Sequence, residues 1–238
     1  MPAVELKQGF TQMSNDQSGV RRGVLFDIDG TLVDTSYIHT VSWWQAFRQA
    51  GLDASMARIH RAIGMGGDHL VHEVTDGAAD DQADTLKTSH DALYSAYWPA
   101  LRLLPGAREL VRHCHDVGLV TVLASSAGSA EFEVLTRVLE LDDVIDAATG
   151  SADADSSKPD PDIVLVALAK ARLEPANAIF VGDAVWDVHA SIKAGLRCIG
   201  LESGGTSAAE LMEAGAVQTY RDAADLLARF SGSPLDLP

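Results

Sequence analysis

Four short apolar runs lie along the chain, and polar or glycine residues of the kind found in loops follow them. The runs cover residues 24–26, 119–124, 178–181 and 198–201. Apolar runs of this length, bounded by such residues, predict buried strands that end in loops.

Segments with a helical pattern lie between these strands. Residues 105–117 begin with Pro105, which suits the start of a helix. Residues 129–140 and 161–172 have similar patterns, and "DVHASIKAG" ends at Gly195, a natural residue just beyond a helix C-terminus. Strands that alternate with helices predict right-handed βαβ units. The fold class that follows is α/β, with a doubly wound, Rossmann-like parallel sheet.

One long segment breaks this alternation. From Ser36 to about Arg102 the sequence has only helical patterns, and "LLPG" at 103–106 returns the chain to the sheet. This predicts a small helical cap domain inserted after the first strand. The expected division is a flexible N-terminal extension over 1–20, a core domain over 21–35 and 103–230, the cap domain over 36–102 and a loose tail over 231–238.

Composition narrows the range of partners and compartments. The net charge of −16 repels nucleic acid and anionic membranes, so we expect neither as a partner. No run approaches the ~20 apolar residues of a membrane span, and the first residues lack the pattern of a secretory signal. Two cysteines, Cys114 and Cys198, are too few for a disulfide framework. We therefore expect a cytoplasmic protein, as a monomer or weak homodimer.

The stretch "LFDIDGTLVD", residues 25–34, places two carboxylates directly after the first predicted strand. Asp27 and Asp29 are two residues apart, so in an extended backbone they point the same way. Each would suppress the ionisation of the other unless a cation neutralised both, and oxygen ligands favour Mg²⁺. Gly30 and Thr31 then offer backbone N–H groups to an anion. The alternative is an ordinary capped turn.

Three other predicted loops at the same sheet edge carry polar groups. "LASS" provides Ser125 and Ser126, "SSKPDP" provides Lys158, and "GDAVWD" provides Asp183 and Asp187. Taken singly, these could be a plain loop, a surface lysine and a helix cap. Taken together, they supply carboxylates, hydroxyls and one lysine, a set that suits phosphoryl transfer.

The order of these motifs resembles the haloacid dehalogenase (HAD) superfamily, over roughly residues 22–222. The chain is most like the branch with a helical cap after the first strand, the phosphoglycolate phosphatase and β-phosphoglucomutase-like proteins. The resemblance implies a Mg²⁺-dependent hydrolase that acts on a small phosphorylated metabolite. Asp27 matches the nucleophile, which would form an aspartyl-phosphate. Asp29 matches the general acid/base.

The resemblance also implies roles for the other loops. Ser125 matches the residue that binds the transferring phosphoryl group, with Ser126 and Thr31 as further substrate-binding groups. Lys158 matches the cation that neutralises the nucleophile. The metal ligands would be Asp27, Asp183 and the backbone carbonyl of Asp29. Asp187 matches a supporting acid that holds Lys158 or a metal-bound water.

Several branches of the superfamily are less compatible with the chain. Asp29 argues against a dehalogenase, whose leaving group needs no proton. A phosphonatase would use a cap lysine, but the only lysine of the predicted cap, Lys87, stands far in sequence from the expected substrate loop. A relative without activity is disfavoured because every expected catalytic position is filled.

A β-phosphoglucomutase-like phosphosugar mutase is the main alternative. "DTSYIHTVSW" resembles its first cap helix and places His39 at a position that faces the cleft. Mutases of this branch carry Glu-Asp where this chain has Gly182-Asp183, and they use a cap arginine, whereas residues 63–71 contain no lysine or arginine. We therefore favour a monophosphate phosphatase, with His39 and the loop from Gly64 to His69 as its specificity elements.

Overall fold

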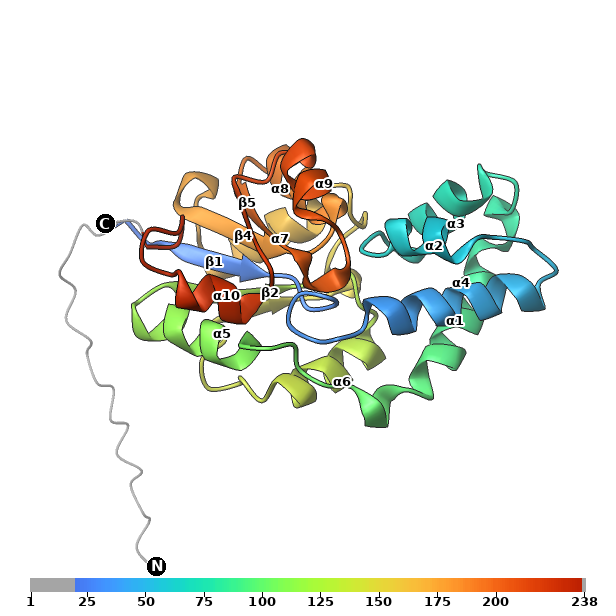
Figure 1. Cartoon of the computed structure of the whole chain (residues 1–238), viewed down its shortest axis with the longest axis horizontal. Coiled ribbons are helices and arrows are strands. Elements are labelled where there is room, and N and C mark those ends of the chain that lie inside the picture. Colours follow the sequence, from blue (N-terminus) through green and yellow to red (C-terminus); the bar gives the residue numbers. More distant parts are fainter. Residues whose placement is uncertain (1–19, 237–238) are drawn as a thin grey trace, which may run out of the picture.

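The computed structural model describes residues 20–236, which form a core domain and a helical lobe (Figure 1). The core is built on one sheet, whose strands are β1 Gly23–Phe26, β2 Val120–Ala124, β3 Ala147–Thr149, β4 Ala178–Gly182, β5 Arg197–Leu201 and β6 Gln218–Tyr220. Their order is β3-β2-β1-β4-β5-β6, and all neighbours pair in parallel. The predicted α/β class with a doubly wound parallel sheet is confirmed.

The sequence pattern misses β3 and β6, the two strands at the edges of the sheet. Each has three residues, "AAT" and "QTY", and is only partly buried. An edge strand has a partner on one side only and can be short and partly polar. Such a strand leaves no apolar run in the sequence.

The helices follow the predicted alternation, with ends that differ by one or two residues. The α-helices are α1 Ser36–Gln49, α2 Met56–Ala62, α3 Gly67–Thr75, α4 Ala83–Ser95, α5 Ala107–Asp116, α6 Ser129–Leu139, α7 Asp162–Ala171, α8 Val185–Lys193, α9 Ala208–Ala214 and α10 Ala223–Ala228. Short 3₁₀ helices cover Asp80–Gln82, Trp98–Ala100, Ser151–Asp153, Pro175–Asn177 and Glu202–Gly204. Over residues 20–236, none of the helices has both the length and the apolar character needed to cross a bilayer.

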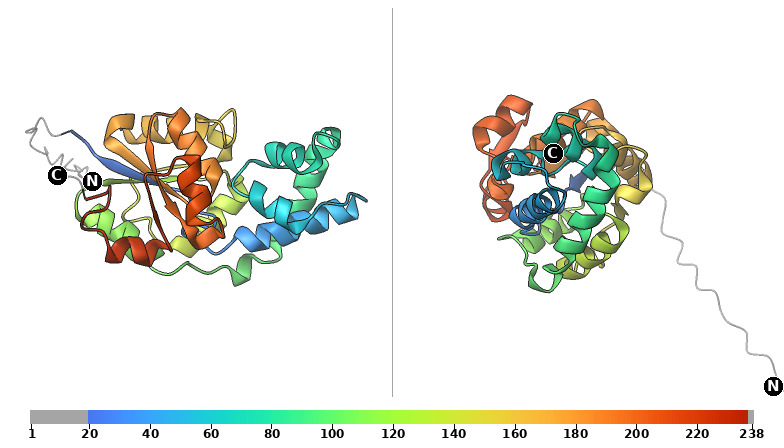
Figure 2. Two further views of the ribbon diagram at one scale, coloured as in Figure 1. Left: turned by 45° about the horizontal axis from the view of Figure 1, so that its top comes forward. Right: turned by 90° about the vertical axis from the view of Figure 1, so that its right-hand side faces the viewer.

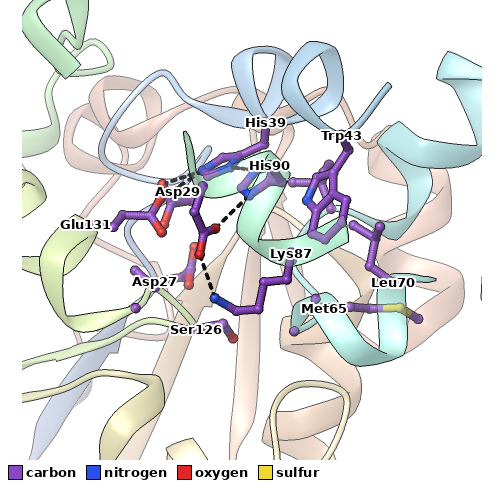
Figure 3. A pocket seen from close by; sticks show the side chains of 17 residues that line it. Asp27, Asp29, His39, Trp43, Met65, Leu70, Lys87, His90, Ser126 and Glu131 are labelled. Carbon is purple, nitrogen blue, oxygen red and sulfur yellow. Dashed lines mark hydrogen bonds and ion pairs between the residues drawn. The ribbon is translucent and has the colours of Figure 1, made fainter. Parts of the chain in front are cut away.

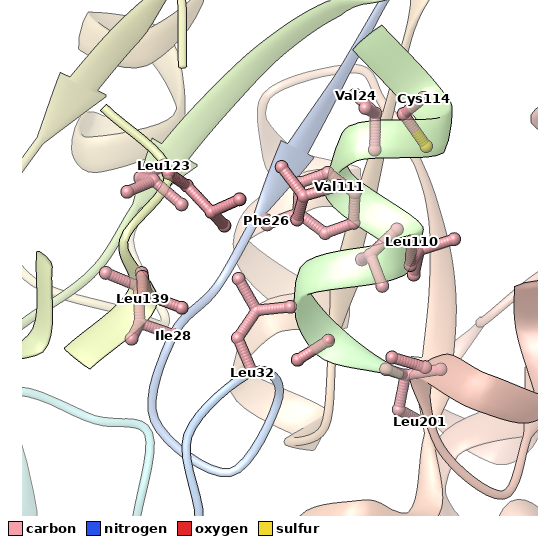
Figure 4. Close-up of a cluster of buried hydrophobic side chains, with 14 of the residues drawn as sticks. Val24, Phe26, Ile28, Leu32, Leu110, Val111, Cys114, Leu123, Leu139 and Leu201 are labelled. Carbon is pink, nitrogen blue, oxygen red and sulfur yellow. The ribbon is translucent and has the colours of Figure 1, made fainter. Parts of the chain in front are cut away.

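Helices cover both faces of the sheet (Figure 2). Alternate residues of β1 enter two separate apolar clusters. Phe26 packs on one face with Leu110 and Val111 of α5, as Figure 4 shows. Leu25 belongs to the cluster on the other face, with Phe180 of β4 and residues of α7. Each fully buried side chain of this size contributes about 2 kcal/mol through the hydrophobic effect, which holds the sheet between its two helical layers.

Helices α1 to α4 form the lobe that the sequence predicts as an insertion. The chain leaves the core after β1 and returns before α5, and the lobe lies beside the core in Figure 1 and in the left view of Figure 2. The lobe has an apolar cluster of its own, in which Phe47, Ile59, Leu70 and Leu86 are buried. The lobe therefore has an apolar interior of its own, separate from the two clusters that pack on the sheet.

The two ends of the chain were expected to be loose. The N-terminal extension lies outside the described residues except for Val20, which is exposed. In the tail, Leu235 is only 3% exposed and belongs to the apolar cluster that contains Phe26. Residues 231–236 therefore differ from the expected loose tail, because Leu235 buries its side chain against the core.

Candidate active site

Polar residues gather where β1, β2 and β4 end, at the side of the sheet that faces the helical lobe (Figure 1). Asp27 follows β1, Ser125 follows β2 and Asp183 follows β4. The strand order reverses between β1 and β4, because the chain first builds toward β3 and then returns toward β6. Ligands of open α/β sheets bind at such a switch point. Lys158, from the loop between β3 and α7, and Asp187, from α8, reach the same place.

A buried lysine joins two of these carboxylates. Lys158 Nζ lies 2.5 Å from Asp27 Oδ1 and 2.7 Å from Asp187 Oδ1, and it donates to the Ala124 carbonyl oxygen at 3.3 Å. Burial alone would lower the pKa of the amine, but the negative charges of Asp187 and Asp27 outweigh it and raise the Lys158 pKa. The lysine is therefore a fixed positive charge beside Asp27.

Three buried carboxylates surround this single lysine. Ligand oxygens of Asp27, Asp183 and Asp187 all lie within 4.8 Å of one another. Burial raises the pKa of Asp27 to about 7, the charges of Asp187 and Asp29 add to the rise, and Lys158 opposes it. Burial and the charges of Asp187 and Asp27 also raise the pKa of Asp183. Three carboxylates and one lysine give this cluster an excess of acidic groups over basic ones. Hard divalent cations prefer oxygen ligands, so these carboxylates fit a metal ion.

Glycine and threonine place the carboxylates of this cluster. A Cβ at Gly204 would overlap Asp183 Oδ2, and a Cβ at Gly182 would overlap Asp187 Oδ2. Thr31 Oγ1 donates to Asp183 Oδ1 at 2.8 Å. The sequence alone does not indicate this role of Gly204, because only the fold brings Gly204 next to Asp183.

The main-chain groups of the first loop differ from the expected anion site. The Gly30 N–H donates to the Val33 carbonyl at 2.8 Å, and the Thr31 N–H donates to the Ile28 carbonyl at 3.3 Å. These bonds close the turn itself, so both N–H groups have partners inside the protein. Thr31 is fully buried, and its contact is with Asp183.

Asp29 lies in a second polar cluster. Its Oδ1 accepts a hydrogen bond from Thr35 Oγ1 at 2.8 Å and lies 3.3 Å from His39 Nε2, and its Oδ2 lies 3.5 Å from Ser125 Oγ. Burial would raise the pKa of Asp29, but the hydrogen bond and charge of His39, with the bond from Thr35, lower it. The carboxylate therefore rests in its charged form.

His39 also contacts two residues that the sequence reasoning missed. Its Nε2 lies 3.2 Å from Glu131 Oε1, and its Nδ1 lies 3.0 Å from His90 Nε2. Burial would lower the pKa of His39, but its bonds to Asp29 and Glu131 raise it to about 10. Glu131 stands at the first turn of α6, six residues after Ser125. One sequence signal could have identified Glu131: it lies at the start of the helix that follows the Ser125 loop, at the edge of the sheet where the other site residues gather.

A pocket lies between the core and the lobe, and Figure 3 shows its lining. Asp27, Asp29 and Ser126 line it from the core, whereas Ser125 is fully buried and its Oγ accepts a hydrogen bond from the Ala127 N–H at 3.0 Å. From the lobe, residues 63–67 line it, and these include the first four residues of the loop from Gly64 to His69 that the sequence selects as a specificity element. His69 is not among the lining residues.

Lys87 also lines this pocket, and this corrects the sequence-based expectation. The expectation rested on distance along the chain. In the fold, α4 packs beside α1 and α3. A Cβ at Gly67, in the expected substrate loop, would lie 3.3 Å from Lys87 Cγ. The lysine of the lobe is therefore next to the substrate loop.

This chain is similar to known proteins in both sequence and structure. The sequence model of the haloacid dehalogenase-like hydrolases matches residues 24–201. A phosphoglycolate phosphatase of Pseudomonas putida is 28% identical over 190 residues, which are 77% of this chain and 70% of that protein. A β-phosphoglucomutase of Bacillus subtilis is 26% identical over 196 residues, 77% of this chain and 84% of that protein. The crystal structure of a hydrolase from Pseudomonas syringae superposes with a TM-score of 0.85 at 32% identity, covering 90% of this chain and 99% of that one.

Proposed function

The chain belongs to the haloacid dehalogenase-like hydrolase family and is a phosphatase of that family, and from this premise we propose that it hydrolyses a small phosphorylated metabolite with Mg²⁺ through an aspartyl-phosphate. The observation that carries the proposal is the contact of 2.5 Å between Lys158 Nζ and Asp27 Oδ1. It keeps the nucleophile beside a fixed cation, with Asp29 two residues away at the pocket.

In the first step, an oxygen of Asp27 forms a bond to phosphorus while the bond between phosphorus and the alcohol oxygen breaks. The departing alcohol takes a proton from Asp29. In the second step, Asp29 removes a proton from water, the water oxygen attacks phosphorus, and the bond to Asp27 breaks. Phosphate leaves and the Asp27 carboxylate is restored.

Asp29 needs a source for the proton that it delivers, because its pKa is lowered in the resting site by His39 and Thr35 despite its burial. His39 can hold that proton. Its Nε2 lies 3.3 Å from Asp29 Oδ1, and its bonds to Asp29 and Glu131 raise its pKa to about 10 in spite of burial. We assign His39 to a positioning and proton-storing role that acts through Asp29.

A metal ion would be held by Asp27 and Asp183, together with the Asp29 carbonyl that the family resemblance implies. When bound, it would supply positive charge to the phosphoryl oxygens, as divalent ions do in phosphoryl transfer. Asp187 supports this arrangement from the chain's own side, because it holds Lys158 at 2.7 Å and accepts a hydrogen bond from the Ala184 N–H at 3.1 Å.

A phosphosugar mutase is the less favoured alternative. A mutase must hold a bisphosphate at both ends, which requires a cation on the lobe side of the pocket. Among the described residues that line the pocket, Lys87 is the only lysine or arginine, and Asp91 pairs with it at 2.8 Å. The described residues of this lining therefore have no unpaired lysine or arginine that could bind a second phosphate.

Hydrolysis of 4-nitrophenyl phosphate tests the proposal. We expect phosphate release that needs Mg²⁺, stops on chelation and is absent from Asp27→Asn. Asp84→Asn, at an exposed site on α4 away from the pocket, is the matched control. Full activity of Asp27→Asn, or activity unaffected by chelation, would contradict it. Conversion of a hexose 1-phosphate to its isomer without release of phosphate would favour the mutase.

A further inference from the structure

Lys87 and Asp91 lie one turn apart on α4 of the lobe, and both line the pocket. Figure 3 shows Lys87 among the lining side chains. We propose that this pair makes the enzyme select phosphate monoesters whose leaving alcohol is uncharged and polyhydroxy, and discriminate against alcohols that carry a carboxylate or a second phosphate. The inference rests on the proposed phosphatase function and names the substrate class of the same site.

The pair is electrically neutral and fixed in place. Lys87 Nζ donates to Asp91 Oδ2 at 2.8 Å, and His90 Nδ1 lies 2.9 Å from Asp91 Oδ1. Both oxygens of Asp91 therefore have a donor. Partial burial would raise the pKa of Asp91, but the hydrogen bonds from His90 and Lys87 lower it, so the carboxylate is charged. A bound substrate would therefore meet the charged carboxylate of Asp91, an acceptor, directly beside the charged amine of Lys87, a donor.

Among the described residues, the rest of the lining offers no unpaired cation for a second anionic group. His90 is neutral at physiological pH because burial lowers its pKa to about 4. His39 is already paired with Asp29 and Glu131. A carboxylate placed near Lys87 would stand next to Asp91, and the repulsion between like charges opposes the attraction of the lysine.

Uncharged hydroxyl groups suit this surface better. A hydroxyl both donates and accepts a hydrogen bond, so it can use Asp91 and Lys87 together. The neighbouring wall is apolar, with Trp43, Met65 and Leu70 from the lobe. The C–H surface of a polyhydroxy alcohol can pack on this wall while its hydroxyls face the charged pair.

The test uses pairs of substrates that differ in one group. Glycerol 3-phosphate and 3-phosphoglycerate, and 2-hydroxyethyl phosphate and phosphoglycolate, differ only in having CH₂OH in place of a carboxylate. We expect kcat/KM for the uncharged member to exceed that for the carboxylate member by roughly 10-fold or more in each pair, which corresponds to about 1.4 kcal/mol.

Two variants should move this ratio in opposite directions. Asp91→Asn leaves Lys87 without its carboxylate partner and should lower the preference about 10-fold, whereas Lys87→Gln leaves the charge of Asp91 without the lysine that offsets it and should increase the preference. Both side chains are about half exposed, so both variants should fold. The control Asp84→Asn lies on the same helix outside the pocket and should leave the ratio unchanged.

The outcomes separate this inference from the proposed function. Equal or greater kcat/KM for the carboxylate members, or an unchanged ratio in both variants, would overturn the inference while hydrolysis of 4-nitrophenyl phosphate stands. If the wild-type enzyme with Mg²⁺ hydrolyses neither these substrates nor 4-nitrophenyl phosphate, the proposed function fails and the inference fails with it.

Discussion

His39 Nε2 lies 3.3 Å from Asp29 Oδ1, and this contact joins the helical lobe to the core, because His39 belongs to α1 and Asp29 follows β1. Glu131, from α6 of the core, lies 3.2 Å from the same nitrogen. The ring of Tyr94 stacks on His39 at 4.0 Å. The acid/base assigned to Asp29 is therefore oriented by residues from both parts of the molecule.

This arrangement predicts a dependence on the leaving group. Glu131→Gln keeps the shape of the side chain but removes the charge that helps to hold the His39 proton. We expect kcat for an alkyl phosphate to fall by ~10²-fold, which is within the usual contribution of acid–base catalysis. The fall for 4-nitrophenyl phosphate should be small, because nitrophenolate leaves without a proton. An equal loss for both substrates would show a merely structural role for Glu131.

His90 predicts a change of stability with pH. Burial lowers the pKa of His90 to about 4, below its ordinary value of 6.5, so the unfolded chain binds more protons between these values. The contribution of His90 is therefore complete above pH 6.5 and is lost as the pH falls toward 4. Its size is roughly 3 kcal/mol.

The measurement is the free energy of unfolding of the wild type and His90→Gln from pH 4 to pH 8. His39 and Asp91 face His90 in both proteins, so the difference between the two isolates the histidine. We expect this difference to rise with pH up to about 6.5 and then to stay level. A difference that does not vary with pH would contradict the neutral state of His90.

Lys158→Met should destabilise the protein. The variant leaves Asp27 and Asp187 buried without the cation that both contact. Removal of one partner from a buried ion pair typically costs about 3–5 kcal/mol, because the remaining charge is uncompensated. Denaturant unfolding at pH 8 without metal measures this loss. The double variant Lys158→Met/Asp187→Asn should recover part of it, and no recovery would argue against charge as the cause.

Gly204→Ala tests the metal site through stability. The new methyl group would overlap Asp183 Oδ2 and displace the carboxylate. Saturating Mg²⁺ should stabilise the wild type, by about 2.7 kcal/mol at 100 times the dissociation constant, and this gain should be lost in Gly204→Ala. Gly150→Ala is the matched control, because its Cβ has only ordinary contacts, the nearest at 3.4 Å. Equal Mg²⁺ stabilisation of both variants would contradict the placement of the metal at Asp183.

Much of the fold follows from the sequence because its central strands are apolar runs of normal length. The sequence also predicts that Asp27, Asp183 and Lys158 lie together, since the carboxyl ends of parallel strands share one edge of the sheet. Glu131, His90 and Lys87 could not be placed in this way. They reach the site from helix faces, and which face points inward depends on how the lobe packs against the core.

The most direct test of the account is the detection of phosphate on Asp27. Enzyme in excess is mixed with a ³²P-labelled phosphate monoester and Mg²⁺, quenched in acid within milliseconds to seconds, and its peptides are mapped. We predict transient label on the peptide that contains Asp27, longer-lived label in Asp29→Asn, and none in Asp27→Asn. Complete turnover of the substrate with no label at any time in the wild type and Asp29→Asn, together with hydrolysis retained by Asp27→Asn, would contradict the proposed role of Asp27 as the nucleophile.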